Sequence, residues 1–405
     1  MKCARIAVIA MAAALPRAMH AQHTDTIVAR TPGNVAEADV RRLTLDWQAS
    51  VDRSEIGDIG GLALGPDGRI YIWDPATPSI WMMSTDGKTV ARIGRRGAGP
   101  GEYGRLNGIA VMKNGNLVAW DEGNTRVNFY DPNGKFLSSA IVPYPFCCPS
   151  NVVTADTLDR VWLYFIDGVV PRGGEKGDPL STTRTRRSAF LVLDHTGAVR
   201  DTIEAPQLRQ EFAPLSAVGP NSVSARVMPY GGVPRHVASP LGRVIAGTGR
   251  PYVVYSAGGA RPLRIESSMT AVPISREERG QWRASLEAAL KRVQPDWKWT
   301  GPDIPSEKPA YADLRVGMDG RIWVGLSVPS EAFTPEPAAA SDGPPLPQIT
   351  FRVTEKRWDV FSSEGAFIAR VVGPRRFTPY VMSGSTMWGV LRDADDVPTV
   401  VRMKF

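Results

Sequence analysis

Apolar and polar residues alternate in four short runs between residues 94 and 137, and turn sequences separate the runs. The segment reads GRRGAGPGEYGRLNGIAVMKNGNLVAWDEGNTRVNFYDPNGKFL, with Asn-Gly pairs at 114–115 and 133–134. Asn-Gly is the strongest short-range signal of a β-hairpin, because a type I′ turn needs positive φ angles at both central residues. The pattern therefore predicts one four-stranded antiparallel meander.

The same pattern recurs at an offset of 47 residues, since LALGPDGRIYIWD (62–74) matches IAVMKNGNLVAWD (109–121). A period of 40–50 residues is typical of propellers and solenoids. Further inner hairpins are predicted at 152–164, 238–247, 314–325 and 381–391, and outer hairpins at 188–203, 251–265 and 356–372. The sequence therefore predicts an all-β fold, a six-bladed β-propeller with four-stranded antiparallel blades.

The last predicted blade has only three strands before the sequence ends. Residues 42–49 (RLTLDWQA) form a strand pattern without a partner near the N-terminus. Propellers commonly close their ring with a terminal strand, because this removes an open sheet edge. We expect residues 42–49 to be the outermost strand of blade six, within a propeller domain spanning 41–405. Residues 22–40 are polar and contain Pro and Gly, so we expect a flexible segment there.

One position of the second strand is aromatic or aliphatic in every predicted blade. A residue that recurs in this way belongs to the repeated core rather than to a cofactor site. We expect these side chains to pack between neighbouring blades. They are Tyr71, Val118, Trp162, Ile245, Trp323 and Trp388.

Uneven spacing between the inner turns indicates three inserts, at residues 167–187, 272–310 and 329–348. The second contains ISREERGQWRASLEAALKR, where Ser275 and Glu278 form a capping box ahead of an apolar face; this predicts an amphipathic helix. Because each strand reverses direction, all three inserts fall on one face of the propeller, opposite the Asp-Gly turns. Binding residues gather on loops held by a rigid scaffold, so this is the predicted working face.

The N-terminus, MKCARIAVIAMAAALPRAMHAQ, has the pattern of a secretory signal peptide. Two basic residues precede an apolar run of about ten residues, which is too short to span a bilayer. We expect residues 1–21 to be removed, and we expect a secreted or periplasmic protein without a membrane span. A buried N-terminal helix is the alternative interpretation.

The charge of the chain does not favour a nucleic-acid partner. Removing residues 1–21 takes three basic and no acidic residues from totals of 48 and 41, which leaves a net charge of +4. Two cysteines then remain, Cys147 and Cys148, which form either a strained vicinal disulfide or free thiols. We expect a monomer that is held together by its apolar core.

Residues 94–137 also resemble the NHL repeat. GAGPGEY ahead of GIAV, followed by WDEGNTRV and FYDPNGKFL, is similar to that family's Gly-Pro-Gly-aromatic start, Asn/Arg loop and final turn. The whole chain resembles secreted bacterial six-bladed propellers of the NHL-repeat and TolB-like type. The resemblance implies the fold and leaves the activity open, because function does not follow from fold.

Few residues of the expected mature chain are suited to catalysis. Its three histidines, His23, His195 and His236, fall in separate parts of the predicted fold, which argues against a three-histidine zinc site. The sequence has no Gly-x-Ser-x-Gly motif. We therefore favour a binding module without a cofactor over an enzyme.

Residues just before the innermost strands line the mouth of the predicted channel. Arginines in this position suit carboxylate or phosphate groups through bidentate hydrogen bonds, and Arg184, Arg186 and Arg187 of the first insert add positive charge. We expect the mouth to contact an anionic small molecule or a protein partner. The predicted ligand-binding residues are Arg105, Asn107, Asn151, Arg235, His236, Tyr311, Arg375 and Arg376.

The alternative function is a calcium-dependent lactonase or esterase. Ca²⁺ prefers carboxylate and amide oxygens, and such donors fall near the channel axis at Asp58, Asn107, Asn151 and Asp313. Six-bladed propellers of the gluconolactonase and paraoxonase kind work through an axial ion of this type, and the resemblance implies hydrolysis. Their ligand set includes a glutamate near the start of the first blade, for which Glu55 is the nearest candidate.

Overall fold

The computed structural model describes residues 26–31, 33–52, 54–142, 153–167, 187–220, 222–259, 261–335 and 346–405, mostly as short antiparallel strands. Six sheets form a repeated series: four of them have four strands and two have five, and strands from the N-terminal segment contribute to three of the six. The first three are β4 (Gly61–Leu64), β5 (Ile70–Asp74), β6 (Ser79–Met83) and β7 (Thr89–Ile93); β8 (Leu106–Val111), β9 (Leu117–Asp121), β10 (Arg126–Tyr130) and β11 (Phe136–Ile141); and β12 (Val153–Ala155), β13 (Val161–Asp167), β14 (Arg187–Leu193) and β15 (Val199–Glu204).

The second half of the chain repeats this arrangement. Its sheets are β18 (Arg235–Ala238), β19 (Val244–Gly247), β20 (Val253–Ala257) and β21 (Leu263–Ser267); β24 (Tyr311–Val316), β25 (Ile322–Leu326), β28 (Glu355–Phe361) and β29 (Phe367–Pro374); and β30 (Phe377–Ser383), β31 (Thr386–Arg392) and β32 (Pro398–Lys404). Innermost strands contact one another around a ring, for example β4 with β8, β8 with β12 and β30 with β4. The fold is a six-bladed β-propeller, as predicted.

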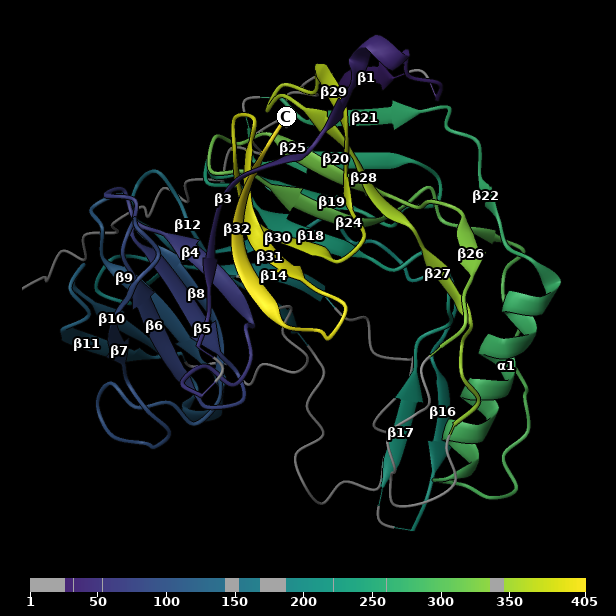
Figure 1. Ribbon diagram of the computed structural model, residues 1–405, viewed down its shortest axis with the longest axis horizontal. Coiled ribbons are helices and arrows are strands. Elements are labelled where there is room, and N and C mark those ends of the chain that lie inside the picture. The colour runs from purple at the N-terminus through teal and green to yellow at the C-terminus, as the bar shows by residue number, and fades with distance from the viewer. Residues whose placement is uncertain are drawn as a thin grey trace, which may run out of the picture.

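The last blade is completed from the N-terminal side of the chain. Strand β3 (Thr44–Ser50) pairs antiparallel with β32, with Thr44 opposite Lys404 and Ser50 opposite Thr399. The prediction that residues 42–49 supply the outermost strand of blade six is therefore confirmed. The ring is closed by hydrogen bonds between the two ends of the propeller, as Figure 1 shows where the purple β3 lies beside the yellow β32.

The segment before β3 differs from our expectation of a flexible stretch at residues 22–40. Strand β1 (Ile27–Thr31) adds in parallel to β21 of blade four, and β2 (Val40–Arg42) adds in parallel to β29 of blade five. A one-turn 3₁₀ helix, η1 (Glu37–Asp39), precedes β2. These short strands cover the outer edges of two blades, whose backbone N–H and C=O groups would otherwise be unpaired.

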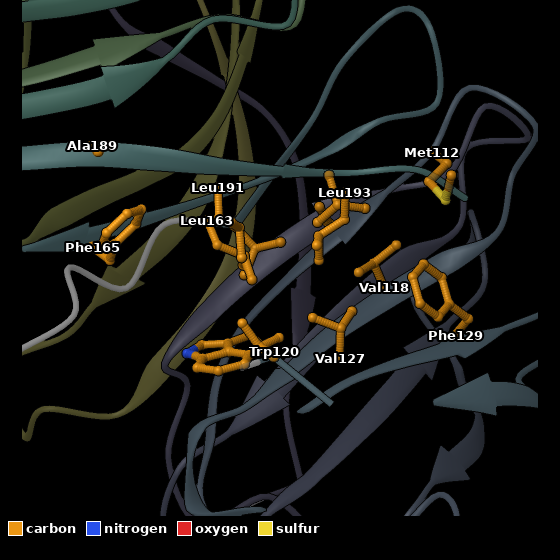
Figure 2. Packing of buried hydrophobic residues seen from close by; sticks show 14 residues of the cluster. Met112, Val118, Trp120, Val127, Phe129, Leu163, Phe165, Ala189, Leu191 and Leu193 are labelled. Atoms are coloured by element: carbon orange, nitrogen blue, oxygen red, sulfur yellow. The ribbon is translucent and has the colours of Figure 1, made fainter. Parts of the chain in front are cut away.

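Each boundary between blades has its own buried apolar cluster. The six predicted second-strand residues fall in six different clusters, so the prediction that they pack between blades is confirmed. Figure 2 shows the cluster between blades two and three, where Val118 and Trp120 lie opposite Leu163 and Leu191. The other five clusters contain Tyr71, Trp162, Ile245, Trp323 and, partly buried, Trp388.

Aspartates at the ends of second strands fix the loops that lead into the innermost strands. The carboxylate of Asp74 accepts hydrogen bonds from the backbone N–H groups of Gly57 and Ala76, each at 2.8 Å. Asp121, 47 residues later, accepts from the N–H of Gly104 at 2.9 Å. Both aspartates are fully buried, so their role is to fix the loops at the mouth of the channel.

The second insert contains the predicted helix, α1 (Arg276–Lys291), whose N-cap Ser275 accepts a hydrogen bond from the backbone N–H of Glu278. A hairpin between blades three and four, which the sequence did not predict, is made by β16 (Leu215–Val218) and β17 (Val223–Arg226). Two more short pairs accompany the inserts: β22 (Val272–Pro273) with β23 (Glu307–Lys308), and β26 (Ser330–Ala332) with β27 (Phe351–Val353). We call the β16–β17 hairpin, α1 and the β26–β27 pair the cap; Figure 1 shows β16, β17 and α1 standing away from the blades.

Strand direction places the whole cap on one face of the propeller. The hairpin and α1 lie in connections between blades, and β26–β27 lies between the second and third strands of blade five. Residues 168–186 of the first insert lie outside the described part of the chain. Among the described residues, no helix is long and apolar enough to cross a membrane.

Candidate functional site

Four arginine side chains line one open pocket on the cap-bearing face. It has a volume of about 520 Å³ and lies where β27 of the cap meets blades five and six. Arg375 and Arg376 come from the turn between β29 and β30, Arg352 from β27, and Arg392 from the end of β31. We call it the arginine pocket. Its other lining residues are Phe333, Thr334, Pro335, Thr378, Ala394 and Asp396.

The turn that carries Arg375 and Arg376 is held by residues on either side. Strand β29 ends at Pro374, which pairs with Glu355 of β28, and β30 begins with Phe377. Phe377 is fully buried in the cluster between blades five and six. The two arginines therefore occupy a two-residue connection whose ends are both anchored in the ring.

Hydrogen bonds and ring contacts hold three of the guanidinium groups. Arg392 pairs with Asp58 at 2.9 Å and with Asp396 at 3.5 Å, and Arg376 donates to the backbone carbonyl of Asp393. The guanidinium of Arg352 lies over the ring of Phe333, 4.4 Å from its centroid, as in a cation–π contact.

The arginine pocket carries an excess of positive charge. Partial burial, followed by the neighbouring charges of Arg352 and Arg376, lowers the pKa of Arg375. Within the described ranges, no carboxylate lies at ion-pair distance from Arg352, Arg375 or Arg376. An anion with several oxygens could therefore accept hydrogen bonds from more than one guanidinium at once.

The structure places Arg105 and Asn107 around one carboxylate of blade two. Nε of Arg105 donates to Oε2 of Glu122 at 2.8 Å, and Nδ2 of Asn107 donates to the same oxygen at 2.9 Å. Glu122 belongs to η2 (Glu122–Asn124), a short 3₁₀ helix directly after β9. Arg105 is thus neutralised by its own blade and does not join the arginine pocket.

His236 and Tyr311, which we expected at the channel mouth, lie inside the ring instead. The ring of His236 stacks on Tyr164, Nε2 lies 2.8 Å from the carbonyl of Pro206, and burial lowers the His236 pKa. Tyr311 is 1% exposed and donates its O–H to the carbonyl of Val253 at 2.6 Å. At these two positions, near the start of an innermost strand, the side chains are buried in the packed interior, because each innermost strand lies between neighbouring blades.

The oxygen donors of the calcium hypothesis have other partners. Asp58 pairs with Arg392, Asn107 binds Glu122, and Oδ2 of Asp313 accepts from Nε of Arg315 at 2.7 Å. Asn151 lies outside the described residues. Across the part of the chain that is described, no group of three or more histidine, cysteine or acidic side chains is arranged to hold a metal ion.

The remaining predicted residues divide between the surface and the parts that the structure does not describe. Arg235 is exposed at the start of β18, and Arg187 is exposed at the start of β14. Arg184, Arg186, Cys147 and Cys148 lie outside the described residues, so the two possibilities for the cysteines both stand.

Sequence reasoning found two of the four arginines in the pocket and missed Arg352 and Arg392. Arg392 directly follows the predicted inner hairpin at 381–391, where the second strand ends on the predicted working face, so its position carried a usable signal. Arg352 lies in β27, in the long connection between the second and third strands of blade five, where the repeat provides no equivalent position.

A comparison with protein-family models agrees with the fold. Residues 48–170 match a family model described as a 6-bladed beta-propeller. A search of the curated proteins found no match. Among solved structures, a Bacteroides fragilis protein described as exported is 13% identical (94% of this chain, 99% of that chain, TM-score 0.48). A DUF4221-family member from Bacteroides vulgatus is 11% identical, with 90% of this chain and 97% of that chain covered and a TM-score of 0.49. Virginiamycin B lyase from Staphylococcus aureus is 10% identical, with 90% of this chain and 99% of that chain covered and a TM-score of 0.43.

Proposed function

We propose that this protein is a secreted or periplasmic binding module of the NHL-repeat and TolB-like type, and that its arginine pocket binds a small anionic ligand. In this proposal residues 1–21 serve as the signal peptide. The ligand carries carboxylate or phosphate groups, because the planar guanidinium fork matches both in a bidentate geometry.

One observation carries the proposal: four guanidinium groups line a single pocket with only one carboxylate among the lining residues. That carboxylate, Asp396, already pairs with Arg392. Like charges held together raise the free energy of the empty pocket, and a bound polyanion would relieve that repulsion.

The openness of the pocket predicts a salt-dependent affinity. Charges exposed to solvent are screened over about 8 Å at physiological ionic strength. Binding of an anion to the arginine pocket should therefore weaken as sodium chloride is added. Binding that is insensitive to salt would point away from this pocket.

The test is calorimetric titration and thermal-shift measurement with citrate and inorganic phosphate at fixed ionic strength. The variant Arg352→Gln/Arg375→Gln removes two guanidinium groups that have no ion pair among the described residues, and it should weaken binding at least tenfold. Arg200→Gln is the control, because Arg200 pairs with Asp194 at 2.6 Å beside a turn on the opposite face. Equal loss in both variants, or no binding of either anion at millimolar concentration, would reject the proposal.

A calcium titration separates this proposal from the hydrolase alternative. Asp58, Asn107 and Asp313 are engaged by Arg392, Glu122 and Arg315, so we expect millimolar Ca²⁺ to leave the melting temperature unchanged. A rise in melting temperature that is lost in Asp313→Asn would favour the calcium-dependent lactonase or esterase.

A further inference from the structure

A second pocket lies on the same face, between the cap and the mouth of blade five. Its volume is about 450 Å³, within the range of small-molecule sites. Residues 352–353 and 378–379 form the wall between the two pockets: Arg352 and Thr378 face the arginine pocket, while Val353 and Pro379 face the second one. We call this second cavity the blade-five pocket.

The walls of the blade-five pocket are largely apolar. The connection after the β16–β17 hairpin contributes Met228 and Val233, and the end of β25 contributes Leu326 and then Val328. Trp358 of β28 forms a further part of the wall. Since both the cap and the ring supply apolar surface, the cavity is suited to the apolar body of a ligand rather than to a free inorganic ion.

Basic side chains in the blade-five pocket outnumber acidic ones. The lining includes two carboxylates, Asp313 and Glu355, and each is already paired, with Arg315 and Arg357 respectively. The ammonium group of a third basic residue, Lys308, is directed into the cap, where Nζ donates to Ser330 Oγ at 2.6 Å. The remaining basic lining residues are Arg235 and Lys356.

Lys356 is the cation best placed to receive a ligand. Nζ donates to the backbone carbonyl of Phe377 at 2.7 Å, and among the described residues no carboxylate lies within ion-pair distance of it. Burial, followed by the charge of Arg315, lowers the Lys356 pKa, although the charge of Asp313 opposes this shift. A partly buried ammonium without a direct ion-pair partner is unfavourable, and a carboxylate beside it would stabilise its charged form.

Arg235 adds a second cation at the rim. It is exposed at the start of β18 and has no ion-pair partner among the described residues. A ligand carboxylate near the rim would therefore meet Lys356 on the blade-five side, with Arg235 on the blade-four side contributing to the same positive field.

We propose that the blade-five pocket binds an organic acid, with its apolar body against Met228, Leu326 and Val328 and its carboxylate at Lys356. This site differs from the arginine pocket in position and in ligand chemistry, because it needs both an apolar body and one negative charge. The proposal does not depend on the arginine pocket binding any anion.

The test compares acids with alcohols of the same skeleton. Decanoate, 4-phenylbutyrate and indole-3-acetate are titrated calorimetrically beside decanol, 4-phenylbutanol and indole-3-ethanol. At least one acid should bind at sub-millimolar concentration and at least tenfold more tightly than its alcohol. If no acid binds below millimolar concentration, or if every alcohol binds as well as its acid, the proposal is rejected.

Three variants assign the binding to this pocket. Lys356→Gln should weaken acid binding at least tenfold, whereas Lys356→Arg should retain most of it. Ala312→Phe should block binding by filling the cavity from β24, where Ala312 is an exposed lining residue. Wild-type affinity in Lys356→Gln or in Ala312→Phe would overturn the proposal.

Two controls exclude general effects of charge and of the other pocket. Lys88→Gln removes a lysine that pairs with Asp86 at 3.2 Å beside a turn on the opposite face, and it should leave acid binding unchanged. Arg352→Gln/Arg375→Gln should also leave acid binding unchanged. A failure of the proposed anion binding at the arginine pocket can therefore be distinguished from a failure of acid binding at the blade-five pocket. Loss of acid binding in either control would count against the blade-five pocket.

Discussion

The ring and the cap are stabilised by different kinds of contact. The ring has one apolar cluster at each of its six blade boundaries, and the same second-strand position contributes to every cluster. The cap has a single apolar cluster, in which Leu215 and Ala217 of the hairpin pack against Leu286 and Leu290 of α1. The stability of the ring is therefore distributed over six similar clusters, whereas the cap depends on one set of contacts.

A buried polar network joins the cap to the ring. Glu278 of α1 is 3% exposed, and its Oε1 accepts from the hydroxyl groups of Tyr230 (2.6 Å) and Ser330 (2.9 Å). Lys308, at the start of blade five and 5% exposed, donates to Ser330 Oγ and to the carbonyl of Val328. A fully satisfied network of this kind fixes relative position, which matters here because both candidate pockets lie where the cap meets the blades.

The difference between the ring and the cap is tested most strongly by creating a cavity in the ring. Trp323 is 0% exposed between blades five and six, so Trp323→Ala should lower the free energy of unfolding by about 3–5 kcal/mol. Denaturant unfolding followed by circular dichroism measures this. Trp323→Phe is the control: it keeps an aromatic ring and removes an indole N–H that has no hydrogen-bond partner among the described residues, so it should cost less. Equal costs would mean that packing volume does not dominate at this boundary.

A matched cavity in the cap should act locally. Leu290 is 0% exposed, and Leu290→Ala should destabilise the cap cluster by about 2 kcal/mol or more. Hydrogen exchange should accelerate roughly 30-fold or more in α1 and β16, while ring strands keep their wild-type rates. If the ring strands accelerate equally, the cap and the ring unfold as one unit and the distinction fails.

Removing the cation of the network should have a smaller effect that a second change partly reverses. Lys308→Met leaves the buried Glu278 without the nearby positive charge and leaves Ser330 without its donor, which should cost about 1–3 kcal/mol. Lys308→Met/Glu278→Gln removes both charges, and we expect it to be more stable than the single variant. Denaturant unfolding with hydrogen exchange of α1 measures both effects. Additive losses would show that the two residues do not act together.

The same contrast explains how far the sequence predicts the structure. The ring follows from local signals: Asn-Gly and Asp-Gly turns set the register, and a strand pattern without a partner at residues 42–49 predicts the closure. Helix α1 was found from its capping box, which is also local. The β16–β17 hairpin was missed because its strands have only four residues each and their apolar side chains pack against α1, which begins 50 residues later. Strands β1 and β2 were missed because they pair with edges of distant blades.

The candidate site shows the same limit. Arg375 and Arg376 were found because a connection between blades occupies a fixed place in the repeat. Arg105 occupies an equivalent place, yet its partner Glu122 follows from the spatial fold of η2 rather than from any pattern in the sequence. Lys356 lies inside a third strand, where the alternation does not reveal that its ammonium group borders a cavity.

The smallest predicted effect is a pH dependence of stability that arises from His236, a polar residue inside the ring. It tests whether the packing of the ring disfavours the charged form of this side chain. His236 is 6% exposed, and burial lowers its pKa below the usual 6.5. The unfolded chain therefore binds a proton more readily than the native ring does. Stability contributed by neutral His236 should be complete above pH 6.5 and should decline as the pH falls through the lowered native pKa, by at most about 1.4 kcal/mol per pH unit.

Denaturant unfolding at a series of pH values measures this decline. His236→Gln should flatten the dependence near pH 6, whereas His195→Gln, which alters an exposed turn residue, should leave it unchanged. Tyr164, the stacking partner of His236, does not confuse the result, because burial raises its pKa further into the alkaline range. A dependence near pH 6 that persists in His236→Gln would place the titrating group elsewhere. In that case, the apolar packing of the boundary between blades three and four would not be what keeps His236 neutral.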